Sequence, residues 1–500
     1  MKSGRRFGGR RSQRRLSTLP DTFYWHDYET FGVNPSRDRP VQFAGLRTDA
    51  QLNVIGDPLV IYCRPANDFL PHPQACLVTG ITPQKALAEG LPEREFIARI
   101  HEELALPGTC GVGYNSLRFD DEFTRHTLYR NFFDPYAREW QNGNSRWDII
   151  DMVRTTFALR PEGIEWPLRE DGLPSFRLED LTSANGINHE SAHDALSDVH
   201  ATIALTRLIK ERQPRLYNYV LGNRDKRSVL AQMDIEGMKP LLHVSGMFGA
   251  QRHNIALVVP LVVHPKNRNE IICFDLSANP QILFDLEPEQ LQELLYTRTE
   301  DLPPGTERVG LKTVHINRCP ILLTPKMADP ETAQRLGING RECRKHLQEL
   351  RGYRERDASG FSRKIQSIYE GRRFETPADP DLMLYSGGFF SAADKQVIEQ
   401  VRMQSSEELA TGSFVFEDQR LPEMLFRYRA RNYLESLTPQ EYGIWEEFRY
   451  ERLTEARSEA DFCMEEFHVE IETLMAGNDI TEAQRGLLEQ LLDYADTLLA

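Results

Sequence analysis

The pattern of hydrophobic and polar positions predicts a first part of the chain that mixes strands and helices. Runs rich in aromatic and β-branched residues predict strands at 23–31, 41–47, 52–63 and 109–114. The Gly-Asp-Pro break at 56–58 suits an antiparallel connection. Helical periodicity predicts helices at 93–106, 120–131, 146–159, 176–184 and 195–212. We therefore expect an α/β domain over residues 21–212, with a mixed sheet flanked by helices.

Two further parts follow a boundary at Gln213 and Pro214. Short apolar runs between Pro and Gly turns predict strands at 241–244, 255–263, 270–276 and 282–286, as in a small open sheet or barrel. Residues 331–368 are helical by periodicity and highly charged, which completes a β domain with a helical extension over 213–368. Helical patterns at 380–384, 392–403, 422–434, 439–453 and 482–499 predict an all-α domain over 369–500.

The composition is that of an ordinary globular chain with several domains. A chain of 500 residues is too long for one hydrophobic core. No apolar run approaches the roughly 20 residues that a membrane span needs. The seven cysteines are scattered, odd in number and never in Cys-x-x-Cys spacing. This usage argues against a zinc site and a disulfide framework, and it leads us to expect a cytoplasmic protein.

Charge is distributed unevenly along the chain. The formal net charge of −15 is not typical of a nucleic-acid binder, unless basic residues gather along one path. Residues 1–20 contain seven Lys or Arg and no acidic residue. They lack the apolar segment of a secretory signal. A disordered basic tail, a weak electrostatic contact with DNA or RNA, an organelle-targeting segment and a start codon placed too early all remain open.

The first predicted strand carries two carboxylates among aromatic residues, in the stretch Phe-Tyr-Trp-His-Asp-Tyr-Glu-Thr-Phe-Gly at 23–32. Asp27 and Glu29 face the same side, because residues two apart in a strand do so. Burying like charges side by side is costly unless cations compensate them, and hard divalent cations prefer oxygen ligands. Asp285 and Glu287 show the same Asp-x-Glu pattern, so a metal site here depends on partners elsewhere.

Candidate partners occur further along the chain. Asp120 opens a predicted helix soon after a strand ends, where it could also simply cap the helix, as could Asp121 and Glu122. His193 and Asp198 would point roughly 140° apart if one helix held both. The polar composition before the helix instead favours a loop position for His193, from which it could reach a site that includes Asp198.

Four carboxylates and one histidine suit hydrolysis of a phosphodiester. Two divalent ions about 4 Å apart can activate a water and stabilise the leaving oxygen. A histidine can accept the proton of that water near neutral pH. The hydroxyl or the backbone N–H of Thr30 could meet the end of a substrate.

The motif set resembles that of the DEDD superfamily of 3′→5′ exonucleases, in its histidine-containing branch on a ribonuclease-H-like fold. His-Asp-Tyr-Glu-Thr-Phe-Gly, Arg-Phe-Asp-Asp-Glu, Leu-Arg-Pro-Glu-Gly-Ile and His-Val-Ser-Gly-Met-Phe-Gly are further similar to the bacterial exodeoxyribonuclease I family. The similarity runs from about residue 22 to near the C-terminus, with an SH3-like β domain and a helical C-terminal domain implied after the nuclease. The basic tail departs from this family pattern.

The resemblance implies the chemistry and the roles of the five residues. It implies Mg²⁺-dependent, processive 3′→5′ degradation of single-stranded DNA to 5′-mononucleotides, in DNA repair or recombination. Asp27, Glu29, Asp120 and Asp198 would hold two Mg²⁺ ions, with Mn²⁺ able to substitute, and His193 would be the general base.

Arginines and aromatic residues alternate between residues 114 and 177. Arginines can contact phosphates, and Tyr or Trp can stack on unpaired bases, although many of these aromatics could equally form the core. The candidate substrate contacts are Glu29, Thr30, Arg125, Tyr136, Trp140, Arg154 and Arg177. The resemblance also implies a protein partner, the acidic C-terminal tail of single-stranded-DNA-binding protein. Arg160, Tyr219 and Lys239 are candidates for its site by position, or are solvated surface residues, and we expect a monomer.

Other functions agree less well with the sequence. A 3′→5′ exoribonuclease of the same superfamily is the main alternative, and the two further domains argue against it. These domains also argue against a proofreading subunit. A non-catalytic scaffold that binds single-stranded nucleic acid would be expected to lack at least one of the five residues, and none is missing.

Overall fold

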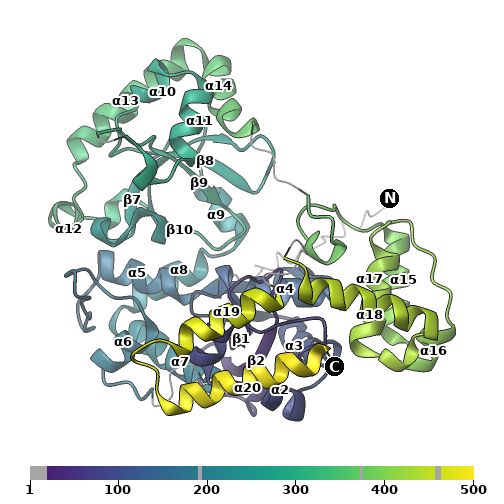
Figure 1. Ribbon diagram of the computed structural model, residues 1–500. Coiled ribbons are helices and arrows are strands. Elements are labelled where there is room, and N and C mark those ends of the chain that lie inside the picture. The colour runs from purple at the N-terminus through teal and green to yellow at the C-terminus, as the bar shows by residue number, and fades with distance from the viewer. Residues whose placement is uncertain (1–19, 190–193, 304, 372–375, 457–462, 500) are drawn as a thin grey trace, which may run out of the picture.

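The computed structural model describes residues 20–189, 194–303, 305–371, 376–456 and 463–499. We call residues 20–222 the first domain, 223–371 the second domain and 376–499 the third domain. In Figure 1 the second domain lies above the first, and the third runs along the side and lower edge of the first.

A five-stranded mixed sheet forms the centre of the first domain. Its strands are β1 (Thr22–Thr30), β2 (Pro40–Asp49), β3 (Leu59–Tyr62), β4 (Thr109–Gly113) and β5 (Ser145–Asp148). They lie in the order β3-β2-β1-β4-β5. Pairing is antiparallel between β1, β2 and β3, and parallel between β1, β4 and β5. This confirms the mixed sheet expected from the sequence.

Helices cover both faces of this sheet. They are α1 (Pro73–Thr79), α2 (Pro83–Glu89), α3 (Glu93–Ala105), α4 (Asp120–Arg130), α5 (Ile149–Leu159), α6 (Leu178–Ala184), α7 (Ala195–Arg212) and α8 (Pro214–Gly222). Alternate residues of β1 enter different cores, since successive side chains of a strand point to opposite faces. Phe23 and Trp25 pack in the cluster that contains α7. Tyr24 and Tyr28 pack in the cluster that contains α3.

The second domain contains an antiparallel five-stranded sheet in the order β10-β6-β7-β8-β9. The elements are β6 (Leu241–Val244), β7 (Ile255–Val263), β8 (Glu270–Asp275), β9 (Leu311–His315) and β10 (Ile321–Leu323), with α9 (Lys226–Gln232), α10 (Ile282–Asp285), α11 (Pro288–Tyr296), α12 (Pro330–Arg335), α13 (Gly340–Arg356) and α14 (Ala358–Glu370). Leu242, Val244 and Leu323 share one hydrophobic cluster with Met152 of α5 and Leu216 of α8. The first two domains are therefore joined by a continuous core.

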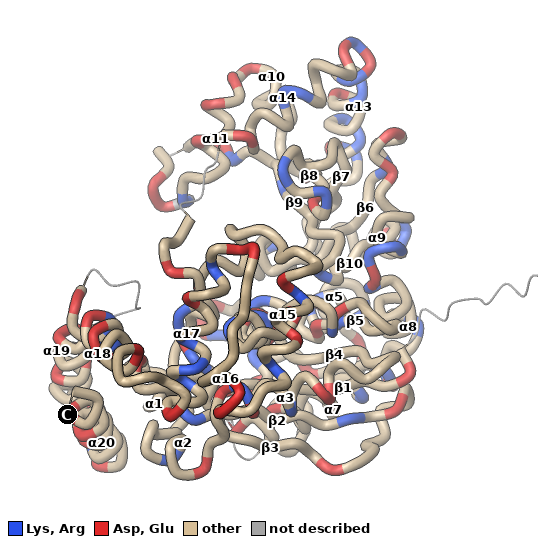
Figure 2. Tube along the Cα trace, turned by 90° about the vertical axis from the view of Figure 1, so that its right-hand side faces the viewer, with Lys and Arg blue, Asp and Glu red and all other residues tan. Residues whose placement is uncertain are grey.

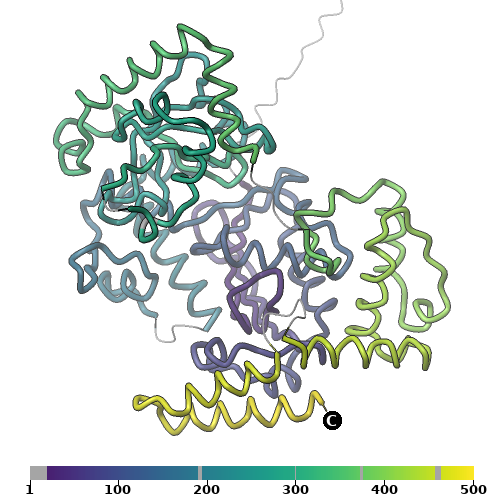
Figure 3. Tube along the Cα trace, turned by 45° about the horizontal axis from the view of Figure 1, so that its top comes forward, coloured from purple at the N-terminus to yellow at the C-terminus, as the bar shows by residue number. Residues whose placement is uncertain are grey.

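The third domain is helical, as expected. Its helices are α15 (Ala392–Met403), α16 (Ser406–Thr411), α17 (Leu421–Asn432), α18 (Pro439–Thr454), α19 (Met464–Met475) and α20 (Glu482–Leu499). One cluster joins Tyr129 and Phe132 to α17, and a second joins Phe31 and Cys76 to α19 and α20. Figure 3 shows the yellow pair α19 and α20 along the edge of the first domain. The third domain thus holds the first at two separate places.

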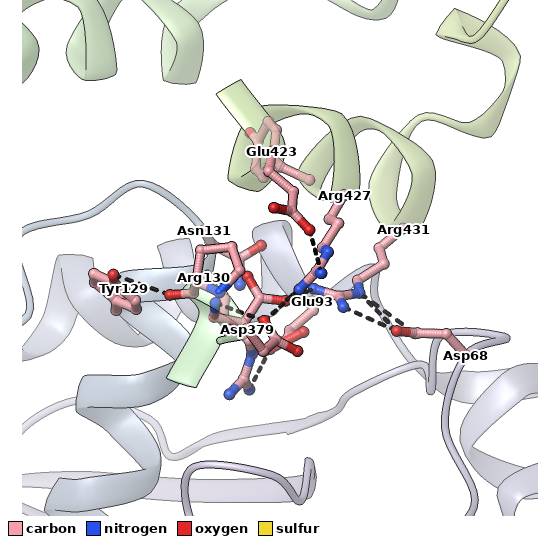
Figure 4. A network of polar contacts seen from close by, with 12 residues as sticks. Asp68, Glu93, Tyr129, Arg130, Asn131, Asp379, Glu423, Arg427 and Arg431 are labelled. Atoms are coloured by element: carbon pink, nitrogen blue, oxygen red, sulfur yellow. Dashed lines mark hydrogen bonds and ion pairs between the residues drawn. The ribbon is translucent and has the colours of Figure 1, made fainter. Parts of the chain in front are cut away.

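A buried network of ion pairs also crosses between the first and third domains (Figure 4). Arg431 on α17 lies 2.9 Å from Asp68 of the first domain and 2.7 Å from Asp381. Arg427 pairs with Asp379 and with Asp381. Figure 2 shows several basic residues along α17. Buried charges are tolerated here because each is matched by charges of the opposite sign.

Three predictions of local structure are wrong. Residues 282–285 form the helix α10, whereas the apolar run predicted a strand. Residues 145–148 form the strand β5 because they pair with β4, whereas a helix was predicted from residue 146. The strand predicted over 52–63 is restricted to Leu59–Tyr62.

All seven cysteines are free thiols, in agreement with the absence of a disulfide pattern. None of the helices in the described ranges combines the length and the hydrophobicity that a membrane span requires.

Candidate active site

The site begins where β1 continues beyond its parallel neighbour. β1 pairs with β4 only from Thr22 to Trp25, whereas its pairing with β2 extends to Thr30. Beyond that point the backbone N–H of Tyr28 donates to the Asp120 Oδ1 at 3.0 Å. A carboxylate therefore satisfies a buried backbone donor of β1. This contact fixes the first residue of α4 beside the acidic end of β1.

Three of the predicted acids meet at this place. Asp27, Glu29 and Asp198 each offer a carboxylate oxygen, and these oxygens lie within 4.8 Å of one another. Asp198 comes from the first turn of α7, which packs on the face of β1 toward which Asp27 and Glu29 point. α7 begins at Ala195 with Asp194 as its N-cap, so His193 precedes the helix in sequence. His193 itself lies outside the described residues.

Burial and mutual repulsion shift the pKa values of these acids upward. Burial, then the charges of Asp120 and Glu29, raises the pKa of Asp27 well above its ordinary value. Burial also raises the pKa of Asp120. The pKa of Glu29 rises to about 8 because of burial and the charges of Asp198, Asp120 and Asp194. A dense set of hard oxygen donors with surplus negative charge fits divalent cations such as Mg²⁺ or Mn²⁺.

Asp148 supports the site from the end of β5, a role that the sequence did not suggest. Its carboxylate accepts hydrogen bonds from the backbone N–H groups of Asn115 at 2.8 Å, Leu117 at 3.2 Å and Ile150 at 3.0 Å. Burial and the nearby charge of Asp151 raise its pKa to about 7. Asp148 thereby fixes the turn between β4 and α4, which carries Asp120. An acid at a helix start is the only signal in the sequence, and it indicates a cap.

Two of the predicted substrate contacts are engaged within the protein. The hydroxyl of Thr30 donates to the carbonyl of Gly32 at 2.6 Å, and the side chain is buried. Arg125 is also buried, and its guanidinium binds both oxygens of Glu139 at 2.7 and 2.8 Å and Glu122 at 2.9 Å. The charge of Arg125 is thus compensated by neighbouring carboxylates.

Tyr136 and Trp140 line a cavity of about 600 Å³ between the first and third domains. Trp140 is 66% exposed. Phe389 of the third domain lines the same cavity, and its ring lies edge-on to Tyr136 with the centroids 6.2 Å apart. Phe389 was not among the predicted residues, because nothing in its sequence neighbourhood connects it to residue 136.

Arg154 lines a second cavity, of about 520 Å³, between the first and second domains. Its guanidinium pairs with Asp151 at 2.8 Å. Lys312 of β9 lines the same cavity, and burial together with the charge of Arg118 lowers its pKa to about 8. Arg177 lies apart from this cavity, at the N-cap of α6, where it pairs with Glu179 at 2.7 Å.

The three candidates for a protein-binding site lie in or beside the junction of the first and second domains. Arg160 donates to the carbonyl of Met327 at 3.2 Å. The hydroxyl of Tyr219 donates to the side chain of Gln232 at 3.1 Å. Lys239 is exposed in the segment before β6.

Family models match the whole succession of domains. The model described as Exonuclease matches residues 24–206, that of the Exonuclease I SH3-like domain matches 224–371, and that of the Exonuclease I C-terminal domain matches 378–498. Exodeoxyribonuclease I of Haemophilus influenzae is 45% identical, over 96% of this chain and 99% of that protein.

Solved structures show the same agreement. Exonuclease I of Methylocaldum szegediense superposes with a TM-score of 0.91 at 50% identity, over 96% of this chain and 100% of that chain. E. coli Exonuclease I in complex with a dA16 oligonucleotide superposes with a TM-score of 0.91 at 46% identity, over the same shares of both chains.

Sequence, fold and site therefore agree along the length of the chain. Membership of this group implies divalent metal ions, which the carboxylate cluster fits. The second domain is SH3-like, as the sequence motifs implied. The chain belongs to the exodeoxyribonuclease I family, the 3′→5′ exonucleases that degrade single-stranded DNA.

Proposed function

We propose that the chain degrades single-stranded DNA processively from its 3′ end, with two Mg²⁺ ions, and releases 5′-mononucleotides. The observation that carries this proposal is the meeting of Asp27, Glu29 and Asp198, with oxygens within 4.8 Å of one another. Asp120 joins them through its hydrogen bond to the backbone of β1. Elements far apart in sequence thus meet at one small oxygen-rich site at the C-terminal end of β1, beyond its pairing with β4.

Each residue of the site has a distinct task in the proposed reaction. The four carboxylates would hold the divalent ions, whose chemistry in such a site would be to activate water and to stabilise the leaving oxygen. His193 accepts the proton of the attacking water. The bond between phosphorus and the 3′ oxygen of the preceding nucleotide breaks. The water oxygen remains on the released 5′-mononucleotide, and the shortened strand ends in a 3′ hydroxyl.

The two cavities between domains support enclosure of the strand. Bases stack on Tyr136 and Trp140 in the cavity shared with the third domain. Phosphates pass Arg154 in the cavity shared with the second domain, and Arg177 contacts the strand near the site. Contacts from all three domains slow dissociation without reading base sequence, which is a physical route to processivity.

The proposal includes a cellular setting. The acidic C-terminal tail of single-stranded-DNA-binding protein would bind near Arg160, Tyr219 and Lys239. This contact would bring a monomeric enzyme to exposed strands during DNA repair or recombination. Charge reversal at Lys239 should weaken recruitment and leave hydrolysis of naked DNA unchanged.

A direct assay tests the reaction. Single-stranded DNA with a 5′ fluorophore should be degraded from its 3′ end in Mg²⁺ and stay intact in chelator, whereas RNA and blunt duplex of the same sequence should persist. Asp27→Asn should abolish shortening, and His193→Ala should slow it by roughly 10²–10⁴-fold, the usual contribution of a general base. Asp285→Asn is the matched control, since this exposed residue begins the other Asp-x-Glu pattern.

Three outcomes would contradict the proposal. They are an intact DNA strand with the wild-type protein, full activity of Asp27→Asn, and activity that a chelator does not reduce. Faster degradation of RNA than of DNA would favour an exoribonuclease instead.

A further inference from the structure

His189 contacts the metal-site acid on α7. Its Nε2 lies 2.5 Å from the Oδ1 of Asp198. The His189 side chain is only 5% exposed, and that of Asp198 is 19% exposed. The contact is therefore a largely buried hydrogen bond to a residue that we assign to the metal site.

The other ring nitrogen of His189 is held by α6. Its Nδ1 lies 3.1 Å from the Oγ1 of Thr182, which is fully buried. This hydroxyl also lies 2.9 Å from the carbonyl oxygen of Leu178 and 3.0 Å from that of Glu179. Thr182 has a single hydroxyl hydrogen, so it donates either to the ring or to one of the carbonyls.

Both arrangements place a hydrogen on Nε2 of His189. If Thr182 donates to Nδ1, the neutral ring carries its hydrogen on Nε2. If Thr182 donates to a carbonyl, the ring donates from Nδ1 to the hydroxyl. Nε2 must then also carry a hydrogen, because Asp198 is ionised when it binds a metal ion. In each case Nε2–H donates to Asp198 Oδ1.

We propose that His189 is a positioning residue that orients the Asp198 carboxylate for the divalent metal ion and is itself oriented by Thr182. The proposal rests on the proposed function only in treating Asp198 as a metal ligand. A hydrogen bond to Oδ1 restricts rotation of the carboxylate and so fixes the direction in which it faces the cation. The chain Thr182–His189–Asp198 also links α6 to α7, so the helix that follows Arg177 helps to set the metal site.

This role differs from that of His193. Both nitrogens of His189 are engaged with protein groups, so His189 is not placed to accept the proton of a water. His189 should therefore govern metal affinity, and His193 should govern turnover. The two histidines, four residues apart in sequence, can be separated by measuring these two quantities.

The decisive measurement is Mn²⁺ affinity without DNA, by isothermal titration calorimetry on the full chain. His189→Ala should weaken Mn²⁺ binding by about 10–100-fold, the usual cost of removing a group that orients a metal ligand. His189→Gln, which keeps an N–H donor at a similar reach, should retain much of the affinity. Thr182→Val should weaken binding less than His189→Ala. The control is His200→Ala, because His200 is an exposed histidine on α7, the helix that bears Asp198.

Activity assays supply the second readout. In His189→Ala the Mn²⁺ concentration for half-maximal activity should rise, and kcat at saturating Mn²⁺ should largely recover. His193→Ala should show the opposite pattern, with lost turnover at unchanged metal affinity.

Unchanged Mn²⁺ affinity in both His189→Ala and Thr182→Val would overturn the proposal. If His189→Ala does not fold, His189→Gln and Thr182→Val test the proposal instead. Equal loss of Mn²⁺ affinity in these two variants would contradict the role of His189 as a hydrogen-bond donor to Asp198. If the wild-type protein binds Mn²⁺ but does not degrade DNA, the proposed function fails while the affinity comparison still tests His189.

Discussion

Glu29 illustrates the energetic conflict at the site. Its pKa of about 8 means that the protein without metal retains a proton there at neutral pH, because burial and three neighbouring carboxylates oppose ionisation. A divalent cation removes this repulsion. The same crowding that makes the carboxylates good ligands therefore makes the metal-free protein less stable when they are charged.

The stability of the metal-free protein should consequently fall as pH rises. The pKa of Glu29 moves from 4.5 in the unfolded chain to about 8 in the folded one, so the folded state binds more protons between these values. The free energy of unfolding should decrease across this window. We expect Mg²⁺ to raise Tm more at pH 8 than at pH 6, by roughly 2–4 °C for each kcal/mol.

Thermal unfolding in chelator and in Mg²⁺ checks this expectation. Glu29→Gln should raise the Tm of the metal-free protein at pH 8 and remove most of the Mg²⁺ effect. Glu170→Gln, an exposed control in the same domain, should behave like the wild type. An equal Mg²⁺ effect at both pH values would show that the repulsion is not the cause.

The sequence predicts the acids of the proposed metal site but not the groups that support them. Strand alternation places Asp27 and Glu29 on one face, and the order of the motifs along the chain indicates their partners. Asp148 and His189 were missed because their roles depend on backbone and side chains brought near only by folding. The alternation of arginines and aromatic residues around Arg125 is typical of phosphate contacts. Its carboxylate partners, Glu139 and Glu122, are recognised only in the folded structure.

At the scale of elements, long segments with strong periodicity predict the type and the bounds of a helix or strand well, whereas short apolar runs do not. The helix predicted at 195–212 has these bounds in α7, and the strand predicted at 23–31 is shifted by one residue in β1. Four-residue elements such as β5 and α10 carry too few positions to distinguish a period of 2 from one of 3.6. Their conformation is decided by partners, and β5 exists because it pairs with β4.

The short strand β5 should nevertheless be essential to the site through its last residue. Asp148→Ala removes the acceptor of two backbone donors in the turn before Asp120 and of a third at the start of α5. We expect a loss of about 1–3 kcal/mol in stability, the cost of leaving buried donors unsatisfied. We also expect kcat to fall more than the affinity for DNA.

Chemical denaturation and single-turnover kinetics measure the two effects separately. Asp171→Asn is a suitable control, because this exposed residue lies in a loop of the same domain. Retained kcat in a folded Asp148→Ala variant would show that the turn does not position Asp120.

At the scale of the molecule, the buried ion pairs join the first and third domains. The neighbouring arginines hold the pKa of Asp68 and of Asp381 below the usual range, against the opposing effect of burial. Their contribution to stability is therefore present above the ordinary carboxyl pKa of about 3.9 and is lost as pH falls through the lowered values. The junction between the domains should be the acid-sensitive part of the molecule.

Arg431→Met should cost about 3–5 kcal/mol, because Asp68 and Asp381 would lose a buried partner. Denaturant unfolding measures this loss, and the double variant with Asp68→Asn should recover part of it. Arg169→Met, which breaks an exposed pair with Asp171, should change stability by about 0–1 kcal/mol. Equal effects of the two arginine variants would contradict a structural role of the buried network.

The packing of Phe31 has a consequence for the order in which the protein is made. Phe31 directly follows β1, and it shares a hydrophobic cluster with Ile471 of α19 and Leu491 of α20. On the ribosome, the strand that bears Asp27 and Glu29 emerges near the beginning of synthesis, whereas the helices that cover its end emerge last. A chain that is released before α19 and α20 are made therefore lacks the hydrophobic partners of Phe31, and the end of the strand that bears Asp27 and Glu29 stays uncovered until synthesis is nearly complete.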